Sequence, residues 1–228
     1  DTHLRDLLAL LRDFEKTSPE LDLRAKVKAL IPAYDTLKEL GKSLIPRGLQ
    51  MAARDRILHY FLAYPCTVIS REELEIVAGI TEWARRVREL RVEHGWHIVS
   101  GKAAQQMQAE GEFTLEDVDV GVMRPDDYIL TSTVQDKKAA YRWNVANDIR
   151  RSNLSVRERL LEYLRANVGE PVSGEELRYV ARRATEWARR IRELRTEHGW
   201  PIATRFSGRP DLSVGEYVLE DDRQSPPH

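Results

Sequence analysis

TEWARRIRELRTEHGWPI, residues 185–202, nearly repeats TEWARRVRELRVEHGWHI, residues 81–98. Each copy places four arginines in one stretch with helical periodicity and closes on Gly-Trp. The match extends upstream, where residues 53–80 align with residues 156–184 and the second copy has one additional residue before its threonine. An internal repeat of this length predicts two similar structural units in one chain.

Each repeat is predicted to contain three helices followed by strands. In the second copy, RERLLEYLRAN (157–167) has one apolar stripe, as an amphipathic helix does. Ser173 and Glu176 then have the spacing of a capping box at the start of a second helix, and Ser70 and Glu73 repeat that spacing. The arginine stretch is the third helix, and strand-like residues with a glycine-proline turn follow it. This order predicts a winged helix-turn-helix in each repeat.

Helical periodicity divides the third helix into an apolar face and a polar face. Trp187, Ile191 and Leu194 fall together and are expected in the core, while Arg189 and Glu193 fall on the outward side. The glycine that ends each copy is expected to form a left-handed cap. The tryptophan after it is expected to anchor the wing, with base stacking as the alternative.

The outward face of this helix is the candidate DNA-binding surface. In a helix-turn-helix it enters the major groove, where arginine pairs with guanine or holds a phosphate. Residues 178–209 hold nine arginines against three glutamates, so the second repeat is predicted to be the stronger contact. The alternative is a solvated charged face, because Arg189 and Glu193 have i,i+4 spacing. The candidate DNA-binding residues are Thr81, Arg85, Arg86, Arg88, Lys102, Thr185, Arg189, Arg190, Arg192, Thr196, Arg205, Ser207 and Arg209.

The expected fold class is mainly α with small β-hairpins: a helical N-terminal region followed by two winged helix-turn-helix domains. The N-terminal region is 1–50, where apolar stripes predict two or three helices and Pro32 is expected to kink or restart one of them. The first domain is 51–132, and its wing contains a long acidic insert that either disfavours phosphate or reaches a partner. A linker helix, 133–153, has basic residues including Arg142 that either touch the DNA backbone or are solvated. The second domain is 154–222, and 223–228 is a tail.

Composition limits the possible functions. The net charge is −1, so attraction to nucleic acid must come from local clustering. One cysteine excludes an internal disulfide and suits the cytoplasm, and no apolar run approaches the roughly 20 residues of a membrane span. The chain starts without methionine and ends in a polar run, so we expect a fragment of a longer protein.

Catalytic motifs are weak in this sequence. The six histidines are scattered and give no set of three or four metal ligands. Pro125-Asp126 and Asp136-Lys137-Lys138 superficially match the layout of metal-dependent nucleases, but the second half lies in a helix-like segment. We therefore expect no catalytic residue, metal or cofactor in this chain.

LRAKVKALIPAYDTLKELGKSLIP, ARDRILHYFL and the repeated EWARRxRELRxEHGW run resemble a bacterial family of HNH restriction-type endonucleases. The resemblance covers nearly the whole chain. It implies a DNA-recognition region that precedes a C-terminal HNH nuclease domain, and a divalent metal would belong to that domain. The family's His-Asn-His motif has no match here, so no catalytic residue is carried over.

The leading hypothesis is double-stranded DNA recognition by tandem winged helices, as the part of a restriction endonuclease that reads its site by sequence or by cytosine modification. A second copy of the chain is a candidate partner. The first alternative is a transcription or replication regulator that binds DNA without cutting it. The second is a winged-helix scaffold that docks other proteins, which a steep salt dependence of DNA binding would exclude.

Overall fold

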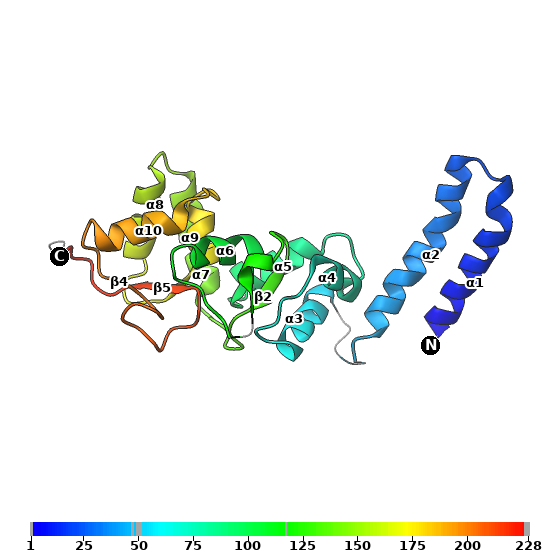
Figure 1. Ribbon diagram of the computed structural model, residues 1–228, viewed down its shortest axis with the longest axis horizontal. Helices are drawn as coiled ribbons and strands as arrows, with labels where there is room; N and C mark the ends of the chain where they lie inside the picture. Colours follow the sequence, from blue (N-terminus) through cyan, green and yellow to red (C-terminus); the bar gives the residue numbers. More distant parts are fainter. Residues whose placement is uncertain (1, 47, 49–51, 117, 226–228) are drawn as a thin grey trace. The chain divides into compact units, whose positions relative to one another are not determined.

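The chain is mainly helical, with small groups of antiparallel strands (Figure 1), in a computed structural model that describes residues 2–46, 48, 52–116 and 118–225. This confirms the expected fold class as mainly α with small β-hairpins. Both ends of the predicted N-terminal region, the first residue of the predicted first domain, Asp117 and the last three residues of the tail lie outside the described residues. The chain forms two compact units, one within 1–60 and 72–87 and the other within 61–71 and 88–228.

The first unit begins with a helical hairpin, α1 (Thr2–Thr17) and α2 (Leu23–Ser43), joined by the 3-10 turn η1 (Ser18–Glu20). Asp22 starts α2 as its N-cap, accepting a hydrogen bond from the Ala25 backbone N–H at 2.8 Å. Pro32 lies inside α2, which continues to Ser43, so the proline does not restart the helix as one alternative had it. α2 packs closely on α4 (Arg71–Ala78) at Gly41, where an added Cβ would lie only 2.3 Å from the Ile76 carbonyl oxygen.

The second unit carries the strands and most of the helices. After α3 (Ala53–Ala63) and α5 (Trp83–Val92), which it shares with the first unit, come β1 (Ile98–Ser100), α6 (Gly101–Gln108), the 3-10 turn η2 (Val120–Val122) and β2 (Tyr128–Leu130). The linker helix is α7 (Ala139–Arg151). The second repeat follows as α8 (Val156–Arg165), β3 (Val172–Ser173), α9 (Gly174–Val180), α10 (Trp187–Thr196), β4 (Ile202–Thr204) and β5 (Glu216–Leu219).

Two small antiparallel sheets close the repeats. In the first, β1 pairs with β2, with Val99 opposite Ile129. In the second, the order is β3-β5-β4, so the last strand lies between the strand before α9 and the strand after α10. The helices α8, α9 and α10 lie on one side of β4 and β5 (Figure 1). Each repeat thus places its third helix directly before a strand that pairs with the end of the same repeat.

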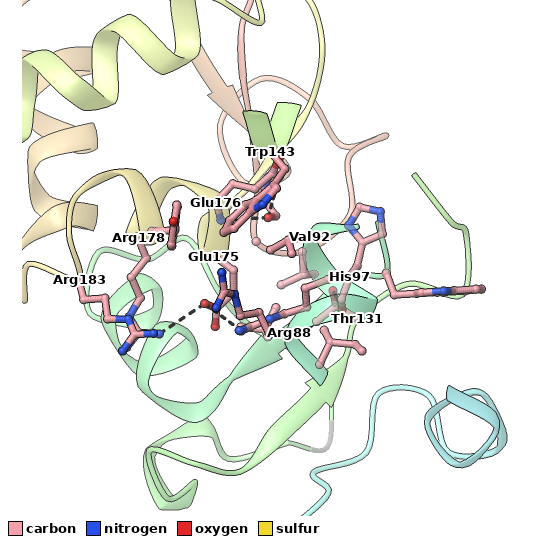
Figure 2. A pocket seen from close by; sticks show the side chains of 17 residues that line it. Arg88, Val92, His97, Thr131, Trp143, Glu175, Glu176, Arg178 and Arg183 are labelled. Carbon is pink, nitrogen blue, oxygen red and sulfur yellow. Dashed lines mark hydrogen bonds and ion pairs between the residues drawn. The ribbon is translucent and has the colours of Figure 1, made fainter. Parts of the chain in front are cut away.

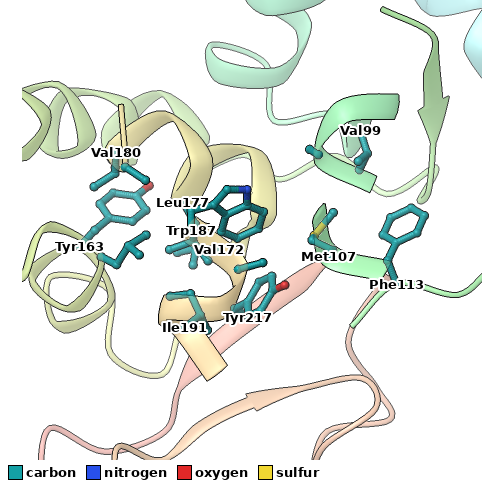
Figure 3. Packing of buried hydrophobic residues seen from close by; sticks show 14 of the residues in the cluster. Val99, Met107, Phe113, Tyr163, Val172, Leu177, Val180, Trp187, Ile191 and Tyr217 are labelled. Carbon is teal, nitrogen blue, oxygen red and sulfur yellow. The ribbon is translucent and has the colours of Figure 1, made fainter. Parts of the chain in front are cut away.

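The insert of the first repeat shares a core with the second repeat (Figure 3). Met107 of α6 and Phe113 of the insert are fully buried in the same cluster as Trp187 and Tyr217. Gly174 makes room for this packing, because a Cβ there would lie 2.4 Å from the Met107 sulfur. The polar insert expected in the first wing is therefore partly a helix with a buried face.

The repeat extends to individual polar contacts. Buried Arg159 donates from Nε to the Val180 carbonyl oxygen at 3.0 Å, and buried Arg56 donates to the Val77 oxygen at 3.1 Å. Each arginine caps the carbonyl end of its repeat's second helix. Burial lowers the pKa of both guanidiniums below the usual arginine value. Sequence analysis missed this pair, because an arginine in an amphipathic helix gives no sign of burial.

Another contact is matched between the repeats, and the structure confirms the capping box predicted at Ser173 and both predicted glycine caps. The Tyr163 hydroxyl donates to Glu176 at 2.8 Å, and the Tyr60 hydroxyl donates to Glu73 at 2.7 Å. The capping box of Ser173 with Glu176 is present at the start of α9. Both Gly-Trp glycines have the predicted left-handed conformation, with φ of 67° at residue 95 and 66° at residue 199. The two arginine helices therefore end in the same way.

Candidate nucleic-acid interface

The α10 helix presents an exposed row of arginines. The side chains of Arg189, Arg190 and Arg192 are 54%, 40% and 49% exposed, while Trp187 and Ile191 on the other side are buried. Thr196 continues the exposed row and donates its hydroxyl to the Arg192 carbonyl oxygen at 3.0 Å. The division into an apolar face and an arginine face follows the predicted periodicity.

A buried carboxylate holds two of these arginines from below. Glu193 is 7% exposed and accepts hydrogen bonds from Arg189 Nε at 3.1 Å and from Arg190 Nη1 at 2.6 Å. The prediction that Glu193 belongs to the outward face is wrong, because the two longer guanidinium side chains cover it. The hydrogen bond from Arg190 lowers the pKa of Glu193 below its usual range. The carboxylate therefore stays ionised and fixes the orientation of both forks.

Two acids from the first-repeat insert pair with the remaining arginines of α10. Arg192 Nε lies 3.2 Å from Glu110 Oε2. Arg195 Nη2 donates to Glu112 Oε1 at 2.5 Å, and the Thr204 hydroxyl donates to Glu112 Oε2 at 2.5 Å. The insert thus reaches a partner within the same chain. These carboxylates offset part of the excess of arginine over glutamate counted along 178–209.

The wing after β4 is folded onto its own basic side chains. Arg205 donates to the carbonyl oxygens of Pro210 and Leu212 at 3.1 and 2.9 Å. Arg209 makes a bidentate pair with Asp211 at 2.9 and 2.7 Å. The Ser207 hydroxyl accepts from Arg195 at 2.8 Å, so it ties the wing tip to α10. The predicted phosphate contacts of the wing therefore already have partners inside the protein.

A groove lies between α6 and α10. Two predicted DNA-binding residues of the second repeat and one of the first repeat line it. Lys102, exposed at the start of α6, lines it together with Thr185 and Arg189. Gln106 crosses this groove, donating to the Thr185 carbonyl oxygen at 2.8 Å and accepting from Trp187 Nε1 at 2.8 Å. The groove has a volume of about 400 Å³, and two acids, Glu110 and Glu186, line it beside the amides and cations. Lys102 and Arg189 are the lining groups that suit a phosphate backbone.

The other predicted residues of the first repeat are not among the residues that line this groove. Thr81 and Arg85 are exposed, and Arg85 lies 3.9 Å from Glu82. Arg86 is half-buried. The guanidinium carbon of Arg88 lies 5.2 Å from the ring centre of Trp143 in α7. Arg88 therefore faces the linker helix rather than continuing the α10 surface.

One residue of the linker helix differs from its predicted role. Arg142 is 5% exposed and donates to both Asp136 and Glu176, with Nε lying 2.9 Å from Glu176. An arginine buried between two carboxylates is not available to DNA, so the backbone contact considered for it is wrong. Burial alone would raise the pKa of Asp136, but hydrogen bonding and the charge of Arg142 hold it below its usual value. Asp136 is thus an ion-pair partner, and the nuclease-like layout around it has a structural explanation.

Within the described residues, no group of three histidine, cysteine, aspartate or glutamate side chains is placed to hold a metal ion. The same residues contain no helix with the length and apolar character that crossing a membrane requires.

The family model described as KpnI N-terminal domain matches residues 54–131 and 157–220, which are the two repeats. Together these stretches make up more than half of the chain. The chain belongs to the KpnI N-terminal domain family. It is therefore related to the N-terminal region of a restriction enzyme. No curated protein and no solved structure gave a significant match.

Three residues of the first-repeat insert contact α10, and the sequence did not predict them. Gln106, Glu110 and Glu112 lie about eighty residues before their partners. Local periodicity carries no signal for such pairing. The only sign in the sequence was that the acidic insert is absent from the second repeat.

Proposed function

We propose that this chain is the DNA-reading region of a restriction-type endonuclease, with α10 and the α6–α10 groove as its main contact. The observation that carries the proposal is the row of Arg189, Arg190 and Arg192, exposed on one helix face and paired with buried Glu193 and half-buried Glu110. A guanidinium has five N–H donors, so one that gives two of them to a carboxylate still presents donors outward. Such a fixed fork suits guanine edges and phosphate oxygens.

The proposal includes the winged helix-turn-helix arrangement of both repeats. Its support is the order of three helices and a closing strand, found twice, and the placement of α10 before β4. The second repeat is the reading head. The first repeat contributes Lys102 and the insert that buttresses α10. The proposed target is double-stranded DNA, in the cytoplasm of a bacterium, with sensitivity to cytosine modification as part of the proposal.

The resemblance to HNH endonucleases supplies the catalytic part of the proposal. Cleavage would be carried out by an HNH nuclease domain elsewhere in the whole protein, and the divalent metal would be bound there. A second copy of the chain is proposed as a partner, because a double-strand cut requires action on two strands.

The arginines of α10 are nearly balanced by carboxylates, and this favours one other function. Because every arginine of α10 has a carboxylate nearby, the surface also suits a protein-docking scaffold. A regulator that binds DNA without cutting is distinguished from the restriction-type proposal by the absence of cleavage in the whole protein. A scaffold is distinguished by the absence of DNA binding.

Fluorescence anisotropy of the 228-residue chain on mixed-sequence duplexes, unmodified and cytosine-methylated, tests the proposal. The variant Arg189→Ala/Arg192→Ala should lose most of the affinity and lower the slope of log affinity against log salt by about two contacts. The control Arg12→Ala/Arg24→Ala removes the same charge from exposed sites on α1 and α2 and should bind as wild type does. An equal loss of DNA affinity in both variants would mean that binding depends only on net charge. No binding at low salt would favour the scaffold.

A further inference from the structure

A cavity of about 70 Å³ lies within the second unit, between residues 88–92 of α5, the linker helix α7 and α9 (Figure 2). At about 10–15 Å³ for each water, this space holds on the order of five water-sized atoms. It therefore admits one compact polyatomic group and excludes a nucleobase. Its position differs from that of the α10 surface, on which the proposed DNA reading depends.

Four arginines line this cavity: Arg88 and Arg91 from α5, Arg178 from α9, and Arg183 from the turn after α9. One carboxylate, Glu175, whose side chain is 11% exposed, forms ion pairs with two of them, with Arg91 Nη1 at 3.0 Å and Arg178 Nη1 at 3.4 Å. Burial alone would raise the pKa of Glu175, but the charges of these two arginines and hydrogen bonds from Ser100 hold it low. Glu175 is therefore ionised and is already fully engaged.

The positive charge of the cavity exceeds what its carboxylates balance. The other acid in the lining, Glu176, accepts from Arg142 and from the Tyr163 hydroxyl, so it is satisfied away from the cavity arginines. Among the described residues, Arg88 and Arg183 make no ion pair. Arg91 Nε and Arg178 Nε are buried and lack hydrogen-bond partners there. Two whole guanidiniums and further donors are thus left over for an anion.

Arg183 occupies a backbone conformation that disfavours any residue with a Cβ. Its φ is 60°, and its neighbour Arg182 has a φ of 56°. The corresponding turn of the first repeat is one residue shorter and has glycine, Gly79, in the left-handed conformation, with a φ of 60°. Arg182 has a structural use, because it donates to the carbonyl oxygens of Arg150 and Ser152. Arg183 has no such use, and a strained residue whose side chain lines a cavity indicates a functional role.

An aromatic wall keeps Arg88 in place. Trp143 and Tyr179, both in the lining, have ring centres 4.4 Å apart. Arg88 lies over Trp143, and the guanidinium carbon of Arg150 lies 4.4 Å from the ring centre of Tyr179. This alternation of cations and rings orients the Arg88 guanidinium without an ion pair. The site is thus built before an anion arrives.

We propose that this cavity binds a phosphate group, held by Arg88 and Arg183 and enclosed by Arg91 and Arg178. Phosphate matches the size of the cavity, and its several oxygens suit more than one guanidinium fork. The group comes from one of two sources, free inorganic phosphate or a phosphodiester of bound DNA. The proposal does not depend on α10 reading DNA.

Calorimetric titration of the full 228-residue chain with inorganic phosphate tests the site, with acetate at equal ionic strength as the reference anion. The test variant is Arg183→Gly, which removes the guanidinium and places glycine at a left-handed position that suits it. The matched control is Arg182→Gly, which removes the same charge one residue away at nearly the same φ. A second test variant, Arg88→Ala, removes the other ligand from an exposed position. Circular dichroism verifies that each variant is folded.

The expected result is phosphate binding by wild type and Arg182→Gly, at least about tenfold weaker in Arg183→Gly and Arg88→Ala, as loss of a charge-assisted hydrogen bond implies. Arg189→Ala/Arg192→Ala should bind phosphate as wild type does, which separates this site from α10. If free phosphate binds no chain but Arg183→Gly alone weakens duplex binding, the phosphate is that of DNA and the proposal holds. Unchanged phosphate and duplex binding in Arg183→Gly and Arg88→Ala would overturn it.

Discussion

Replacing Glu112 with glutamine should destabilise the second unit, because Glu112 joins the first-repeat insert to the second repeat. Its side chain is 7% exposed, and it accepts from Arg195 and Thr204. Removing one partner of a fully buried ion pair costs about 3–5 kcal/mol. Arg195 is 22% exposed and keeps its bond to Ser207, so we expect a loss of about 2–3 kcal/mol.

Urea unfolding followed by tryptophan fluorescence measures this loss, since Trp187 lies in the core that the insert shares. With a slope of about 2 kcal/mol per molar urea, the midpoint should fall by roughly 1 M. Glu116→Gln is the matched control, because it neutralises an exposed acid of the same insert. The double variant Glu112→Gln/Arg195→Gln should lose less than the sum of the two single variants.

A midpoint for Glu112→Gln equal to that of Glu116→Gln would refute this reasoning. The insert would then be a loosely attached wing, and the arginines of α10 would be free of it. Additivity in the double variant would likewise show that Glu112 and Arg195 do not act on each other.

Three further changes test other parts of the structure. Arg183→Gly should raise the free energy of unfolding by about 1 kcal/mol by relieving the left-handed backbone, and a lower urea midpoint would contradict this. Gly174→Ala should lower it by about 1–3 kcal/mol, because the new Cβ would lie 2.4 Å from the Met107 sulfur, and the loss should shrink in a Met107→Ala background. The pKa of Glu175 is lowered in the folded state, so its stabilisation is present above its ordinary pKa of 4.5 and is lost as the pH falls through the lower folded value. Glu175→Gln should therefore flatten the acid side of a stability–pH profile, and an unchanged acid side would exclude this ion pair as the cause.

Features set by neighbouring residues were predictable from the sequence. The alternation of Trp187 and Ile191 with arginines placed α10 correctly between core and solvent. The Ser173 capping box and the Gly-Trp caps fixed where α9 began and α10 ended. Each of these depends on residues within one or two helical turns of each other.

Features set by tertiary contacts were not predictable. Glu110 and Glu112 looked like acids of a polar wing, but they pair with Arg192 and Arg195 of the second repeat. Arg142 looked like a surface cation, but two carboxylates from other parts of the chain surround it. In each case burial depends on partners that the local pattern does not name.

Photo-cross-linking tests the central claim, that α10 contacts DNA, most directly. A photoreactive benzoylphenylalanine placed at Arg189 should cross-link to a bound duplex, while the same group at Arg24 on α2 should not. A cross-link from position 189 that salt removes in parallel with binding is the predicted result. A chain that binds DNA but cross-links only from position 24, or from neither, would contradict the account.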